Sequence, residues 1–70
     1  DWELKLSRAF QEALGPMGVI EFEEIKKQGI TKTTILDYIQ SLRTLHVLEI
    51  KDIKKFKETA TRILEEGNAP

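Results

Sequence analysis

The sequence contains no cysteine and little proline or glycine, which account for two and four of its 70 residues. Without cysteine, a disulfide framework, a thiolate zinc site and a cysteine nucleophile are all excluded. An excess of charge is also lacking, because 11 Lys and Arg residues stand against 12 Asp and Glu residues, for a net charge of -1. This balance argues against charge-driven, sequence-blind nucleic-acid binding, but it is compatible with a local basic patch. No apolar run approaches the roughly 18 residues of a membrane span, so we expect neither a transmembrane segment nor a signal peptide.

Residues that could carry catalysis are equally scarce. His46 is the only histidine in the sequence, and a nucleophile needs a base within reach. The pairs Glu23-Glu24 and Glu65-Glu66 would point in different directions on a helix, whereas acid–base catalysis requires carboxylates held across a cleft. A Gly-rich phosphate loop, an HExxH motif and an EF-hand spacing are absent. We therefore expect a non-enzymatic protein with no metal, no cofactor and no small-molecule substrate. Without disulfides, it fits the cytoplasm (nucleoid-associated) or the nucleus better than secretion.

What the sequence does contain is the composition of one small globular domain over residues 1–70, with 40% hydrophobic and 33% charged residues. Apolar residues at helical spacing predict a first helix over residues 2–14. The Gly-Pro-Met-Gly run at residues 15–18 ends it, because proline cannot continue a helix. Residues 19–20 are either a brief strand or loop anchors. A second helix is predicted over residues 21–28.

The second half of the chain predicts two longer helices separated by a short strand. Thr31 is a plausible N-cap for a third helix that runs from Lys32 to about Leu45. The β-branched character of residues 47–50 indicates a short strand. A last helix is predicted over about residues 52–66, closed by Gly67.

The stretch GITKTTILDYIQSLRTLHVLEI, residues 29–50, has the punctuation of a helix-turn-helix. Gly29 makes the turn, Ile30 anchors it inward, Thr31 caps the second helix, and Ile35 begins its buried stripe. Here the sequence resembles the winged-helix branch of the helix-turn-helix DNA-binding superfamily, over about 30 of the 70 residues. The segment after the strand indicates a helix rather than a returning strand. The resemblance therefore implies a mainly α, winged-helix-like domain with an added C-terminal helix and at most a short β-ribbon.

On this resemblance, the turn and recognition helix span about residues 29–45, and that helix would enter the major groove of double-stranded DNA. Gln40 would read adenine, Arg43 would read guanine or a phosphate, and Asp37 would accept a hydrogen bond from cytosine. An ordinary solvated helix face is the alternative interpretation. The implied DNA-binding residues are Lys26, Lys27, Thr31, Lys32, Thr33, Asp37, Gln40 and Arg43.

A second basic patch follows in the last helix. Lys54 and Lys57 lie on one side of that helix, with Lys51 and Lys55 beside them, so that part of the run could line a duplex. A solvated charged face is again the alternative.

An apolar stripe in the last helix leaves two alternatives open. Ile53, Phe56, Ala60 and Ile63 follow the 3-4-3 spacing of a coiled-coil seam. The stripe either packs on the first helix of the same chain or forms an interface with a second copy or another partner. The outward position of Leu36 adds it to this candidate interface.

Two functions follow from these observations. The first is DNA binding through a helix-turn-helix, as a transcriptional regulator or as the DNA-binding module of a replication or partition protein. The alternative is a winged-helix-like protein-interaction or oligomerisation module without DNA binding.

Overall fold

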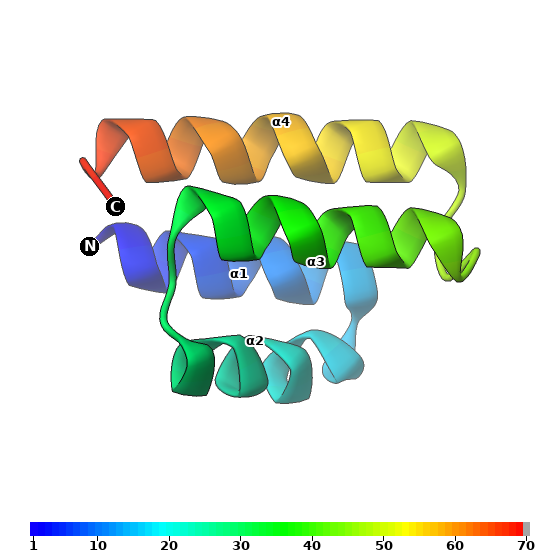
Figure 1. Ribbon diagram of the computed structural model, residues 1–70, viewed down its shortest axis with the longest axis horizontal. Helices are drawn as coiled ribbons and strands as arrows, with labels where there is room; N and C mark the ends of the chain where they lie inside the picture. Colours follow the sequence, from blue (N-terminus) through cyan, green and yellow to red (C-terminus); the bar gives the residue numbers. More distant parts are fainter. Residues whose placement is uncertain (70) are drawn as a thin grey trace.

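Apart from the short connections between them, helices make up the described chain. The computed structural model describes residues 1–69, and these residues form four helices and no strand: α1 (Trp2–Leu14), α2 (Pro16–Gln28), α3 (Lys32–Thr44) and α4 (Ile50–Glu66). Successive helices run in opposite directions (Figure 1). α1 packs against α2 and α4, and α3 packs mainly against α4. The predicted mainly α class is confirmed. The predicted domain extends to Pro70, which lies outside the described residues.

The predicted strand at residues 47–50 is wrong, and the described residues contain no β-ribbon, which the predicted fold class had allowed at most as a short one. A strand needs a neighbour to pair its backbone groups, and residues 1–69 offer none. Instead, the Val47 N–H donates to the carbonyl of Leu42 at 3.0 Å and closes α3 with a tight turn. His46 takes the left-handed conformation in that turn, with φ of 55°. α4 then begins at the last residue of the predicted strand, two positions before the predicted start at Asp52.

α2 begins at Pro16 rather than at Glu21. Gly15 alone makes the turn, with φ of 67°, and proline suits the first position of a helix because it has no N–H to leave unpaired there. Gly18 lies inside the helix, where a Cβ would overlap the backbone of Phe10 in α1. Glycine is thus required for the close approach of α1 and α2. The strand and the loop anchors predicted for the next two residues are both wrong, since both residues are helical.

The core is arranged around Phe10 of α1, which is fully buried. Its ring meets one aromatic ring from each neighbouring helix: Phe22 of α2 at 5.1 Å between centroids, Tyr38 of α3 at 5.5 Å and Phe56 of α4 at 5.1 Å. The two Phe contacts are edge-on and the Tyr38 contact is stacked, both favourable arrangements of aromatic rings. Among residues 1–69 no polar or charged residue is buried, and the Tyr38 hydroxyl is the buried side-chain polar atom that lacks a hydrogen-bond partner. Functional groups of this part of the chain therefore lie at its surface.

α4 ends at Gly67 as predicted, but the residue that turns the chain is the next one. Gly67 is right-handed with φ of -86°, whereas Asn68 has φ of 55°. A Cβ on Gly67 would overlap the side chain of Trp2. This contact brings the two ends of the described chain side by side, at the end of the bundle that also holds the α2–α3 turn (Figure 1).

Candidate nucleic-acid interface

Two threonines hold the turn between α2 and α3. The Thr31 hydroxyl accepts the Thr34 N–H at 3.0 Å, and the Thr34 hydroxyl accepts the Thr31 N–H at 2.9 Å. The prediction of Thr31 as N-cap is confirmed, and Gly29 adopts a φ of 100° that favours glycine. The role of Thr34 was not predicted, although its position three residues after the cap is where a capping box usually has Glu or Gln. The Thr31 hydroxyl thus fixes the start of α3.

The outward face of α3 carries the side chains that the sequence analysis placed on a recognition helix. Ile35, Ile39 and Leu42 are buried as predicted. Leu36 is 38% exposed. The predicted DNA-binding positions of α3 are all exposed: Lys32, Thr33, Asp37, Gln40 and Arg43.

One edge of α3 faces α1 and α2, and the opposite edge faces α4. Tyr38 marks the first edge, because its ring stacks on Phe10. Burial and then the negative charge of Glu21 raise the pKa of its phenol to about 12. Because a helix has roughly 3.6 residues per turn, Lys32 and Arg43 lie on the other edge of α3, toward α4.

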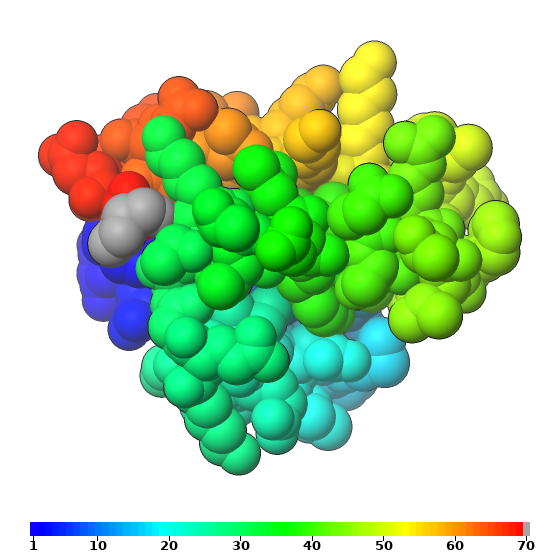
Figure 2. Space-filling view, in the orientation of Figure 1, coloured from blue at the N-terminus to red at the C-terminus, as the bar shows by residue number. Residues whose placement is uncertain are grey.

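The lysines of α4 divide in the same way. Lys55 lines a pocket between α1 and α4, so its side of α4 faces α1. By the helical repeat, Lys54 and Lys57 lie on the opposite side, toward α3. We define the α3–α4 face as Lys32, Leu36, Arg43, Lys54 and Lys57. Figure 2 shows α3 in green beside the yellow and orange side chains of α4.

The cations of the α3–α4 face differ in their partners from three of the four other predicted lysines, the exception being Lys55. Within residues 1–69, none of the four cations of this face makes an ion pair. In contrast, Lys26 pairs with Glu23 at 3.9 Å, Lys27 with Glu24 at 3.4 Å and Lys51 with Glu49 at 3.9 Å. The structure thus brings together part of each predicted basic patch and leaves these three lysines elsewhere.

Acidic side chains limit the basic surface toward the end of α4. Lys54 and Lys57 border a shallow hollow on the outside of α4 that also contains Glu58, Glu65 and Arg62. The positive charge is therefore strongest beside α3 and weakens along α4.

The apolar stripe of α4 belongs to the core of the same chain. Ile53, Phe56, Ala60 and Ile63 are all buried in the single chain. Packing on α1 is therefore the alternative that the structure shows, because buried side chains leave no apolar seam for a second copy. Of the predicted interface residues, Leu36 is the exposed one.

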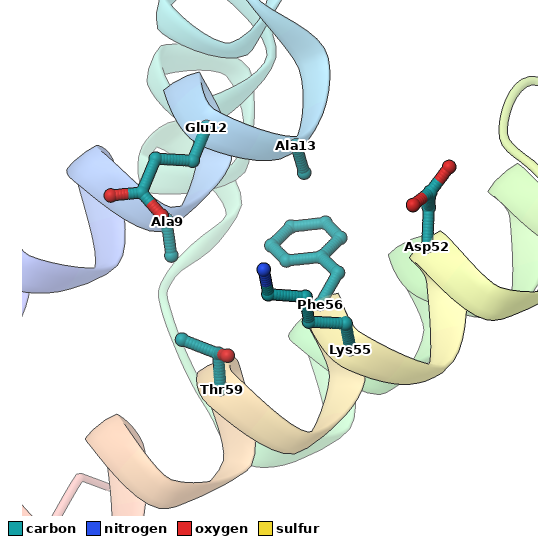
Figure 3. A pocket seen from close by; sticks show the side chains of 7 residues that line it. All are labelled: Ala9, Glu12, Ala13, Asp52, Lys55, Phe56 and Thr59. Carbon is teal, nitrogen blue, oxygen red and sulfur yellow. The ribbon is translucent and has the colours of Figure 1, made fainter.

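A pocket of about 240 Å³ lies between α1 and α4 and was not predicted. Buried Phe56 is part of its wall, and Glu12, Asp52 and Lys55 contribute charged groups (Figure 3). In the figure, the Lys55 ammonium extends toward the side of Glu12, while the Asp52 carboxylate points away. Across the described residues, no three His, Asp or Glu side chains are grouped in a way that could hold a metal ion. The charges around this pocket are mixed, unlike those of the α3–α4 face.

Comparison with protein-family models, curated proteins and solved structures gave no match to this chain. Over residues 1–69, none of the helices has the length and apolar character needed to span a membrane.

Proposed function

We propose that this protein binds double-stranded DNA through the α3–α4 face, as a transcriptional regulator or as the DNA-binding module of a replication or partition protein. One observation carries the proposal. Lys32 and Arg43 of α3 border the same surface as Lys54 and Lys57 of α4, and these cations make no ion pair within residues 1–69. Unpaired cations on one surface are what a phosphate backbone binds.

The two helices have different roles in this complex, because the major groove has room for only one of them. The major groove admits one helix, and α3 presents the more varied polar side chains. In this arrangement Gln40 and Arg43 reach base edges, while Lys54 and Lys57 contact the phosphates beside the groove. Leu36 lies among the cations and suits a thymine methyl group.

Salt dependence of binding to a short duplex tests this proposal. Phosphate contacts by Lys32, Lys54 and Lys57 give a slope of log affinity against log salt of about -2.7, since each contact contributes about -0.9. Fluorescence anisotropy between about 50 and 200 mM salt measures it. Binding that is absent, or insensitive to salt, would overturn the proposal.

Two pairs of variants with equal charge changes locate the binding surface. K54A/K57A removes two cations of the α3–α4 face, whereas K51A/K55A removes two cations from other sides of the same helix. The first pair lowers the magnitude of the salt slope by about 2, and the second leaves it close to that of the unmodified protein. A second matched pair compares K32A/R43A, which removes two cations of the α3–α4 face, with K26A/K27A, which removes two cations of α2 outside it. Equal effects within both pairs would show that net charge, rather than this face, governs binding.

A further inference from the structure

Most of the large exposed apolar side chains lie at one end of the bundle. Ile50 is 72% exposed, Leu45 71% and Ile20 65%, and three further side chains near them are between 41% and 48% exposed. They come from the first turns of α2, the end of α3 and the start of α4, which all lie at the end of the bundle opposite the chain termini (Figure 1). We define the apolar end as Met17, Val19, Ile20, Leu45, Val47 and Ile50.

The connection between α3 and α4 contributes three of these side chains, and the single chain does not bury them. The connection is rich in apolar residues, because Leu45, Val47, Leu48 and Ile50 accompany only two polar residues between positions 45 and 50. In the structure, Leu48 packs against the core, while Leu45, Val47 and Ile50 remain exposed. The connection thus carries an apolar face that the single chain does not bury.

The apolar end has the composition of an interaction surface. The largest apolar patch on a typical monomer is often functional. Leu45 and Ile50 are each more than 70% exposed, and the four other apolar side chains of the apolar end are between 41% and 65% exposed. A standard stable interface buries ~800 Å² on each partner. The apolar end therefore supplies the centre of a small interface, with its polar rim supplying the rest.

The charges around the apolar end favour a second copy of the chain as the partner. The rim carries both signs, with Glu49 and Lys51 paired at 3.9 Å and Glu21 on the neighbouring helix. A strongly basic or acidic partner would select a rim of one sign, and a lipid surface would select a cationic rim. A mixed rim can complement itself across a two-fold axis, and a net charge of -1 per chain adds little repulsion.

We propose that the apolar end binds the apolar end of a second copy, forming a two-fold symmetric dimer. This inference is independent of DNA binding. The contact centres on Leu45 and Ile50, with the first turns of α2 packing at its edge. Because the contact area is small, the dimer is weak and depends on concentration.

Sedimentation equilibrium without DNA tests the dimer. Between about 10 µM and 1 mM, a range that brackets a weak dissociation constant on the order of 100 µM, we expect the mass to rise from monomer toward dimer. A monomer mass at every concentration overturns the proposal, and a mass that rises past the dimer overturns its two-fold form.

Variants at exposed positions locate the contact without disturbing the core. L45Q/I50Q raises the dissociation constant at least about tenfold, since an apolar contact of this area is worth more than 1.4 kcal/mol. L4Q/L36Q, which changes two exposed leucines away from the apolar end, leaves it unchanged. A larger effect of L4Q/L36Q than of L45Q/I50Q overturns the proposal. Helical circular dichroism checks that both variants are folded.

Discussion

The two ends of the bundle are finished differently. At the end that holds the termini, the helices that begin there have side-chain caps: Asp1 accepts the Glu3 N–H at 3.0 Å, and Thr31 exchanges hydrogen bonds with Thr34. At the apolar end, α2 and α4 begin without a side-chain cap. Trp2 at the first end packs against the core, and Leu4 and Leu36 are the large apolar side chains exposed near it, whereas six are exposed at the second end. The difference indicates that one end is complete by itself, whereas the other has surface available for a partner.

The largest expected effect compares the same substitution at the two ends. In Gly18→Ala the new Cβ overlaps the backbone of Phe10, which cannot move aside without separating α1 from α2. We expect a loss of about 2–3 kcal/mol in the free energy of unfolding. In Gly67→Ala the overlap is with the Trp2 side chain, which can rotate away, so the loss is about 1 kcal/mol. Urea denaturation measures both.

A further variant keeps that comparison falsifiable. In the background Trp2→Ala, Gly67→Ala should stabilise the protein, because alanine is the better helix former and the obstacle is gone. Continued destabilisation would show that the Trp2 contact is not the reason for glycine at this position.

The caps give the second comparison. Thr31→Ala removes the hydroxyl that accepts the Thr34 N–H and should cost about 1 kcal/mol. Glu49→Ser at the other end adds a cap to α4 where none exists, and should increase stability by about 0.5 kcal/mol. Thermal unfolding of both variants checks the opposite signs. A destabilising Glu49→Ser would mean that the start of α4 is already satisfied.

A smaller difference in stability is expected between the two non-glycine residues that take the left-handed conformation. His46 at the apolar end has φ of 55°, as has Asn68 at the other end. Asparagine tolerates this conformation better than histidine. His46→Gly should therefore raise the free energy of unfolding by about 0.5 kcal/mol, more than Asn68→Gly does. Melting temperatures that rank the two variants in the reverse order would contradict this.

The smallest effect concerns Tyr38, which lies between the two ends. Its hydroxyl is buried without a hydrogen-bond partner among the described residues, and its pKa is raised from 10.0 to about 12, by burial first and Glu21 second. The folded state thus favours the neutral phenol. The associated stability is fully present below pH 10 and is lost as the pH rises from 10 to 12. Tyr38→Phe should leave the free energy of unfolding nearly unchanged at pH 7. At alkaline pH this variant should lose less stability than the unmodified protein. Parallel unfolding curves against pH test this.

Much of the fold could be predicted from helical spacing, because the buried stripes of α3 and α4 follow it directly. The failures come from short segments that several structures can satisfy. Pro16 ends one helix but also begins the next, and Gly18 is explained by a contact with a distant residue. The β-branched residues Val47 and Ile50 favour a strand, but a tight turn followed by the start of a helix accommodates them as well.

The candidate site could be predicted only in part. Spacing separates Lys54 and Lys57 from Lys51 and Lys55, because that separation needs no more than a helical repeat. It does not show that α3 packs beside α4, and so the grouping of Arg43 with Lys54 required the structure. Likewise, spacing cannot tell a core stripe from a dimer seam, as Ile53 illustrates.

The contact of Trp2 with Gly67 has a consequence for how the protein can be joined to others. Because the chain leaves the bundle where it enters it, the whole unit could be inserted into a surface loop of a host protein without stretching that loop. The inserted unit would then be attached to the host through two adjacent chain ends, and its apolar end would face away from the host.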